Sequence, residues 1–256
     1  MRRLPRYRIA AVGIALLILA GVAAPTQDLS TFLASPPGVG SWARYDVTTV
    51  RGGRRKVRPF RISVTGQREV SGRRYLWLEA WPYKFKDCPD GTLRMLVKEK
   101  PEPEESLNPF LQAVSLAYRE PGEDPFRLSE GALNLLRSRA RKVHIDQEMI
   151  ASGPASLEGA EDDCLKECRR TTIRTRLLGR DHHVEETGCY WLSEKVPFRI
   201  LRAEIDRLER KGRREKRKQI TIVYREGGID GAASRFEEPV KKVKGIWSLL
   251  LGHGTP

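Results

Sequence analysis

Residues 41–82 read SWARYDVTTVRGGRRKVRPFRISVTGQREVSGRRYLWLEAWP and predict three consecutive β-strands. Two short turns, Gly52-Gly53 and Ser71-Gly72, have the composition of hairpin connections. Between the turns, apolar and polar side chains alternate with the period of two that half-buried strands show. The alternating segments are 41–50, 57–65 and 74–82. The stretch therefore predicts an antiparallel meander.

The same alternation continues after the meander and returns near residue 169. The further strand-like segments are 92–98, 169–177, 183–191, 198–209, 220–224 and 229–236. Between the two blocks, 107–118 and 129–143 carry apolar residues at helical spacing, and Ser129 is a plausible helix start. Neither block has enough alternating surface to close a core alone. We therefore predict an α+β fold: one curved antiparallel sheet of about eight or nine strands, with helices from about 105–145 on its concave face.

The first residues have the layout of a secretory signal. Arg2, Arg3, Arg6 and Arg8 precede the apolar run 9–24, which is shorter than the roughly 20 residues that span a bilayer comfortably. Cleavage after Ala23 fits the small residues there, and an uncleaved anchor is the alternative. We expect a signal peptide at 1–24, a linker at 25–40, one domain at 41–239 and a tail at 240–256.

The net charge of +14 falls to +10 without residues 1–27, which hold four arginines and no acidic residue. Export directs the protein to the periplasm or cell envelope, where lipid headgroups and acidic proteins are the available polyanions. Nucleic acid is therefore not an expected partner. Basic clusters at 51–58, 73–74 and 207–218 fall on hairpin turns. They are either solubilising charge or cationic tips that contact an anionic membrane surface, and the first two belong to opposite ends of the meander.

Several segments resemble a known group of proteins. Gly40-Ser41-Trp42-Ala43-Arg44-Tyr45, Ile62-Ser63-Val64-Thr65-Gly66 and Tyr75-Leu76-Trp77-Leu78-Glu79 resemble the opening of uncharacterised bacterial exported proteins. The later segments Trp191–Phe198 and Gly228–Ala232 resemble the closing strands of that group. These proteins are similar to the periplasmic lipoprotein-carrier half-barrel. The resemblance implies a half-barrel with an apolar cavity for acyl chains, and it implies no catalytic residue.

Four cysteines, Cys88, Cys164, Cys168 and Cys189, are the chemically distinctive residues of the chain. An even number in an exported chain predicts two disulfides. Cys168 and Cys189 lie at the same end of a predicted hairpin, so we expect Cys189 to bond Cys168 or Cys164. Cys88 would then bond the remaining one. The alternative is a metal site formed by three of these cysteines, Cys164, Cys168 and Cys189, with His182 and His183, although the spacing matches no tight ligand pattern.

No combination of nucleophile, base and orienting group stands out in the sequence. Cys189 and His183 lack such a context, and Glu161, Asp162 and Asp163 are expected to form a solvated loop. We therefore predict a non-enzymatic protein without catalytic residue, cofactor or metal. Two functions stay open: binding of a lipid or lipoprotein in an apolar cavity, or a structural or interaction role in the envelope. They differ in whether helices and the tail plug the concave face.

Overall fold

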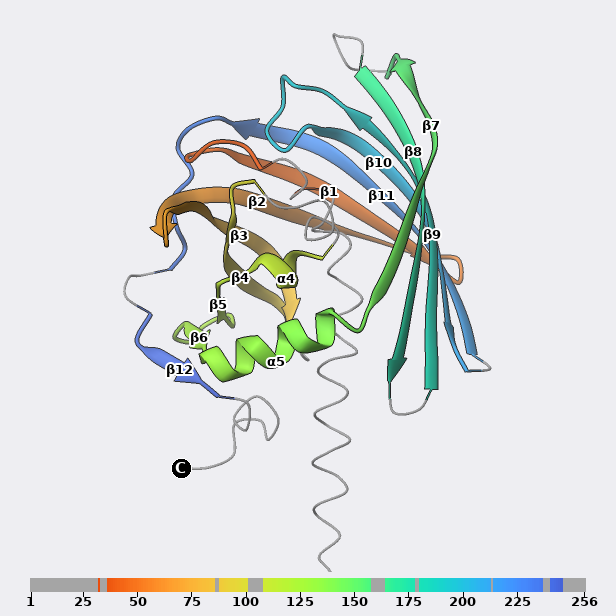
Figure 1. Ribbon diagram of the computed structural model, residues 1–256. Helices are drawn as coiled ribbons and strands as arrows, with labels where there is room; N and C mark the ends of the chain where they lie inside the picture. Colours follow the sequence, from red (N-terminus) through yellow and green to blue (C-terminus); the bar gives the residue numbers. More distant parts are fainter. Residues whose placement is uncertain are drawn as a thin grey trace, which may run out of the picture.

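The structure, a computed structural model, describes Phe32 and residues 36–85, 88–100, 108–157, 164–177, 180–212, 214–236 and 240–245. These residues form one curved, open sheet of twelve strands in the order β12-β6-β5-β4-β3-β2-β1-β11-β10-β9-β8-β7 (Figure 1). The strands are β1 Trp42–Arg51, β2 Arg54–Val70, β3 Arg73–Phe85, β4 Cys88–Lys98, β5 Ser115–Arg119, β6 Phe126–Leu128, β7 His144–Ala155, β8 Cys164–Leu177, β9 Arg180–Leu192, β10 Ile200–Lys211, β11 Arg214–Gly228 and β12 Lys242–Lys244.

The two alternating blocks meet where β1 pairs antiparallel with β11, with Tyr45 opposite Tyr224. The prediction of one shared sheet is therefore confirmed. All neighbouring pairs are antiparallel except β12 with β6, which is parallel. Both blocks contribute their apolar faces to the same core, because a single twisted sheet curves around it.

The inner face of the sheet carries the core. Its side chains alternate along each strand with outward-pointing ones, as the period of two requires. The cluster includes Tyr45 on β1, Val64 on β2, Leu78 on β3, Met95 on β4, Ile205 on β10 and Ile222 on β11. We call the opposite side, with Trp77 and Glu79, the outer face.

The predicted layer of helices from about 105–145 on the concave face is wrong, because the described residues of this range form two short helices together with strands β5, β6 and the start of β7. The helices are α4 Pro109–Gln112 and α5 Glu130–Ala140, which contact each other and strands β4 and β5 respectively. Ser129 caps α5 as expected, since its Oγ accepts a hydrogen bond from the Ala132 N–H at 3.2 Å. The Arg137 Nε on α5 donates to the Ala113 carbonyl at 3.0 Å and ties the two helices together.

The predicted helix over 107–118 is wrong beyond residue 112, because 115–119 form β5. Leu116, Ala117 and Tyr118 are all buried, so three successive apolar residues hide the period of two in this strand. The predicted strand count is also too low. The eight strands expected from 41–98 and 169–224 are present, and β5, β6, β7 and β12 add four.

The ninth expected strand, 229–236, is not a strand in the structure. We call this segment the strap. Its Ala232 N–H donates to the Gly40 carbonyl at 2.9 Å, and it continues over the outer face, where the Arg235 N–H donates to Glu79 Oε2 at 2.9 Å. After the glycines at 227–228 the chain therefore leaves the sheet and does not form another hairpin. Polar residues at the end of the strap contact the outer face.

Part of the predicted tail belongs to the sheet, because Lys242–Lys244 form β12 beside β6. Among the helices that the structure describes, none is long and apolar enough to cross a membrane. The expected signal at 1–24, the acidic run 161–163 and the apolar end of the tail from residue 246 lie outside the described residues.

Candidate functional site: the inner face and its cationic end

An aromatic cluster occupies the inner face between β2 and β10. Phe32 is its centre, with ring centroids 5.0 Å from Tyr45, 5.5 Å from Phe60 and 6.5 Å from Phe198. The Phe32 side chain precedes the sheet, in the segment predicted as a linker, yet it is only 2% exposed. A residue from outside the sheet thus fills a ring-sized apolar position on its inner face.

Tyr45 and its neighbour Tyr224 are the two tyrosines at this cluster, and both are uncharged. Burial raises the pKa of Tyr45 far above its ordinary value, with a smaller contribution from Tyr224. Burial and the nearby Glu226 also raise the pKa of Tyr224. The Tyr45 hydroxyl donates to the Pro197 carbonyl at 3.3 Å, which satisfies the polar end of the ring. The cluster therefore presents apolar surface at every physiological pH.

The inner face changes character toward β8, β9 and the end of β10. Arg207 lies on this face, two residues beyond Ile205, and is fully buried. Its Nη1 lies 3.0 Å from Glu186 Oε1 and its Nε lies 3.1 Å from Glu209 Oε1. The pKa of the nearby His182 is lowered by burial first, then by Lys211 and Arg207, while Glu209 opposes the shift. Hence the inner face has an apolar part and a charged part.

The basic cluster 207–218 was predicted to be exposed at a hairpin turn, and this prediction is wrong for Arg207. The inward orientation of Arg207 could have been predicted from the sequence. Ala203, Ile205 and Arg207 occupy every second position of β10 and therefore lie on the same face. The burial of an arginine at a position of core parity requires acidic partners. Glu186 on the neighbouring strand is directly opposite Arg207 in the register.

Basic side chains gather at one end of the sheet. The β1–β2 turn at 52–53 and the β10–β11 turn beside Gly212 lie at this same end, because Val50 pairs with Gln219 across β1 and β11. The β2–β3 turn beside Arg73 lies at the opposite end, as predicted. We call the exposed residues at the shared end the cationic end, and they are Arg51, Arg54, Arg55, Lys56, Lys211, Arg214 and Lys216. Within the part of the chain that the structure describes, these side chains form no ion pair.

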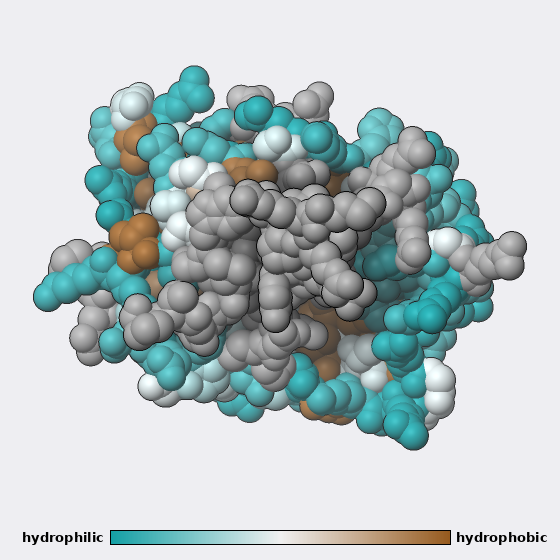
Figure 2. Space-filling view, turned by 90° about the horizontal axis from the view of Figure 1, so that it is seen from below, coloured by the Kyte–Doolittle hydropathy of each residue, from teal (hydrophilic) through white to brown (hydrophobic). Residues whose placement is uncertain are grey.

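Figure 2 views the molecule from below and shows how these surfaces are distributed. Apolar surface is visible toward the middle, whereas the side on the right, where β7–β11 end, is mostly hydrophilic.

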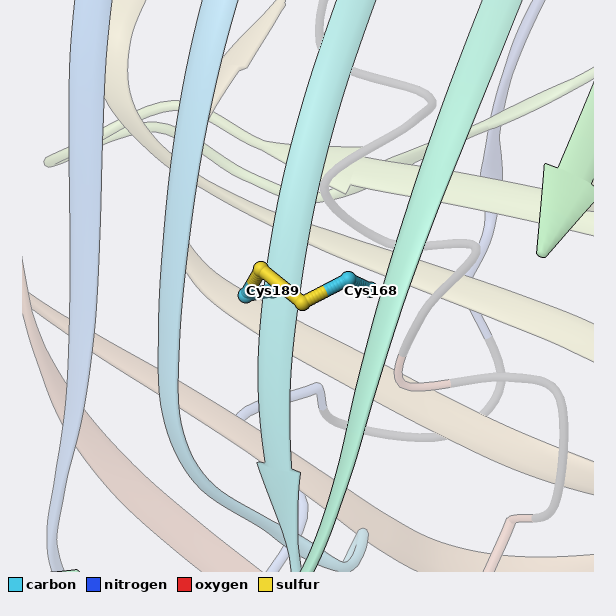
Figure 3. The surroundings of a disulfide bond; sticks show 2 residues. All are labelled: Cys168 and Cys189. Atoms are coloured by element: carbon cyan, nitrogen blue, oxygen red, sulfur yellow. A yellow bond between two sulfur atoms is a disulfide. The ribbon is translucent and has the colours of Figure 1, made fainter. Parts of the chain in front are cut away.

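The Cys168–Cys189 disulfide joins β8 to β9 on the outer face (Figure 3). It is one of the two pairings expected for Cys189. The other expected bridge, between Cys88 and Cys164, is absent because Cys164 is a free, buried thiol whose Sγ donates to the Ala155 carbonyl at 3.1 Å. The physical reason is the sheet order, in which six strands separate β4 from β8. The Cys88 side chain lies outside the described residues.

The alternative metal set is not gathered in one place. Cys168 and Cys189 are bonded to each other, and His182 lies seven residues from Cys189 along β9, about 23 Å in an extended strand. His182 faces inward and its neighbour His183 faces outward, because successive strand residues alternate. No group of three or more metal-ligating side chains occurs among the residues that the structure describes.

Comparison with protein-family models found no match, and comparison with curated proteins found none. Among solved structures, the chain is similar to a putative lipoprotein from Parabacteroides distasonis at 11% identity, over 77% of this chain and 98% of that one, with a TM-score of 0.35. It is also similar to a putative exported protein with a YmcC-like fold from Bacteroides fragilis, at 12% identity over 76% of this chain and 99% of that one, with a TM-score of 0.32. A third similar structure is a LolA superfamily protein from Nitrosomonas europaea, at 10% identity over 80% of this chain and 92% of that one, with a TM-score of 0.29. The first two are named as a lipoprotein and an exported protein, and the third is named for the LolA superfamily.

Proposed function

We propose that the chain is an exported, non-enzymatic protein that binds the apolar chain of a lipid or lipoprotein on the inner face of its sheet. The observation that carries this proposal is the position of Phe32. A side chain from outside the sheet lies among Tyr45, Phe60 and Phe198, where an acyl chain would make the same contacts. The signal-like N-terminus and the disulfide support the exported location, since disulfides persist in oxidising compartments.

The division of the inner face supports the ligand class. A lipid combines an apolar chain with a polar or charged head, and the inner face combines the aromatic cluster with the charged region around Arg207. The cationic end adds exposed positive charge at the tips of the same strands. Each basic residue near an anionic membrane contributes on the order of 1 kcal/mol of attraction. The protein would therefore meet its ligand at an anionic membrane surface.

A second candidate, a structural or interaction protein of the envelope, is favoured by a different observation. The inner-face side chains are already covered in the folded chain, with Tyr45 and Ala203 both 0% exposed. In this function Phe32 and the helices are permanent parts of the core. The two functions therefore differ in one measurable property, namely whether Phe32 can be replaced by a ligand.

Titration with a dansyl-labelled fatty acid distinguishes the two candidates. Phe32→Ala removes a ring whose burial is worth about 1.5–3 kcal/mol, so we expect the variant to bind the fatty acid about ten- to a hundredfold more tightly than the unmodified protein. Phe236→Ala is the matched control, because it removes a buried ring from the outer face. Its affinity should equal that of the unmodified protein. Circular dichroism checks that each variant is folded.

Absence of fatty-acid binding by both the unmodified protein and the folded Phe32→Ala variant would contradict lipid binding and favour the structural role. Equal gains for Phe32→Ala and Phe236→Ala would also contradict it, because the gain would then reflect loosening of the fold. Mass spectrometry of the protein purified from its own envelope gives an independent measurement. Co-purified lipid is the expected result.

A further inference from the structure

A row of side chains crosses the outer face at the β2–β5 end of the sheet. Arg61 pairs with Trp81 across β2 and β3, and Thr92 pairs with Arg119 across β4 and β5. These four residues lie on the outer face with Glu79, because each alternates with inward-facing residues along its strand. Arg235 reaches the same place from the strap, with its guanidinium carbon 4.3 Å from the centroid of the Trp81 ring. Segments more than 170 residues apart in the chain thus meet at one point.

A cavity of about 220 Å³ lies between this row and the strap. Its walls include Trp81, Thr92, Arg119 and Arg235, and Thr92 is only 3% exposed. A water molecule takes about 30 Å³ in the liquid, so the cavity has room for several waters or one small ligand. Drug-sized ligands occupy pockets of about 300–1,000 Å³, so the ligand of this cavity is smaller than those.

The positive charges of this site are not neutralised by the nearest buried acid. Glu79 is 3% exposed, and its carboxylate already accepts hydrogen bonds from Thr65, Ser234 and the Arg235 N–H and pairs with Arg94 at 3.5 Å. The single charge of Glu79 is therefore matched by the single charge of Arg94. The other cations here are the guanidinium groups of Arg119 and Arg235, which line the cavity, and of Arg61, which lies beside Trp81 on the same face.

These three guanidinium groups are held by aromatic rings rather than by carboxylates. Arg61 lies 4.4 Å from the centroid of Trp42, and Arg119 lies 5.9 Å from that of Phe236. Among the residues that the structure describes, none of the three forms an ion pair. The pKa of Arg235 is lowered by burial first and then by the charges of Arg61 and Arg119, with Glu79 opposing. Like charges thus repel one another at a site that the fold holds together.

Acidic side chains also line this cavity. Asp90, Glu120 and Glu123 contribute to its walls, and Asp90 and Glu123 are exposed. A ligand must therefore place its anionic group against Arg119, Arg235 and the Thr92 hydroxyl, and leave a neutral or positive part beside the carboxylates. A phosphate ester satisfies both requirements, since its oxygens match the donor fork of arginine.

We propose that this outer-face cavity binds the phosphate group of a small phosphate ester, with Arg119 and Arg235 as the main donors and Thr92 as a hydroxyl donor. Trp81 contacts the Arg235 guanidinium and so restricts its movement beside the cavity. The site is separate from the inner face, so it does not depend on lipid binding there.

Isothermal titration of the full-length protein tests this site, with inorganic phosphate and glycerophosphoethanolamine as the probes at constant ionic strength. We expect saturable binding of phosphate and a loss of about tenfold or more in affinity for Arg119→Gln and for Arg235→Gln. Arg119→Lys keeps the charge without the fork and should lie between. Arg68→Gln is the matched control, because Arg68 is an exposed arginine at the other end of β2.

Tighter binding of glycerophosphoethanolamine than of phosphate would assign the site to a lipid headgroup, whereas equal binding would assign it to free phosphate. Either result supports the site. No saturable binding of either probe would overturn the proposal. So would an equal loss in Arg68→Gln and Arg119→Gln, because the effect would then come from net charge alone.

Discussion

Replacement of Glu79 by alanine tests whether this buried carboxylate holds the strap to the outer face. Glu79 Oε1 accepts hydrogen bonds from Thr65 Oγ1 and Ser234 Oγ and lies 3.5 Å from Arg94 Nε. Its Oε2 accepts the Arg235 N–H at 2.9 Å. Two of these partners belong to the strap, so the substitution removes these polar contacts of the strap and the Glu79 carboxylate from beside the buried Arg94.

The magnitude follows from burial of both partners. The Arg94 and Glu79 side chains are only 6% and 3% exposed, so the ion pair is screened little by solvent. Removal of one partner from a buried pair costs about 3–5 kcal/mol, because the other charge stays desolvated. We therefore expect Glu79→Ala to lower the free energy of unfolding by about 3–5 kcal/mol. With a urea dependence of up to about 3 kcal/mol per molar, the midpoint should fall by at least about 1 M.

Urea unfolding followed by circular dichroism measures this change. The matched control is Glu226→Ala, which removes the Arg44–Glu226 pair, where both side chains are more than half exposed. We expect the control to cost at most about 1 kcal/mol. The double variant Glu79→Gln with Arg94→Met should recover part of the loss of Glu79→Gln, because it removes both charges of the buried pair.

Limited proteolysis gives a second measurement, since cleavage near Arg235 should become faster when the strap is released. Equal costs for Glu79→Ala and Glu226→Ala would refute the reasoning. So would an additive double variant, because the two side chains would then not act as a pair.

Two further predictions concern the charged side of the sheet. Replacement of Cys168 and Cys189 by alanine should lower the free energy of unfolding by about 3 kcal/mol, because the bridge closes a loop with a sequence separation of 21; urea curves that coincide with those of the unmodified protein would contradict this. The pKa of His182 is lowered in the folded state, so the unfolded chain binds its proton first as pH falls, and stability should drop as the pH is lowered from 7 through the ordinary value of 6.5. Thermal unfolding of His182→Gln should show a weaker dependence over this range than the unmodified protein, and identical slopes would exclude this histidine as the cause.

The alternation of apolar and polar residues was sufficient to predict most of the strands. In 41–98 and 169–224 each strand has one buried and one exposed face, so the apolar side chains repeat every second residue. The same rule fails for β5, which is buried on both faces, and for β7, whose residues are nearly all exposed. The period of apolar residues identifies a strand only when the two faces of the strand have different surroundings. Those surroundings are set by the folded molecule.

The candidate sites depended still more on tertiary structure. The sequence alone determined an export-type N-terminus, two alternating blocks that share a core, and a Cys189 placed to bond either Cys168 or Cys164. Only the folded chain decided that Phe32 enters the inner face, that Arg207 lies buried beside Glu186, and that Arg235 meets Arg119 over the outer face. Pattern along the chain reports which face a residue takes, whereas contacts between distant segments are set by the order in which strands pair and by the curvature of the sheet.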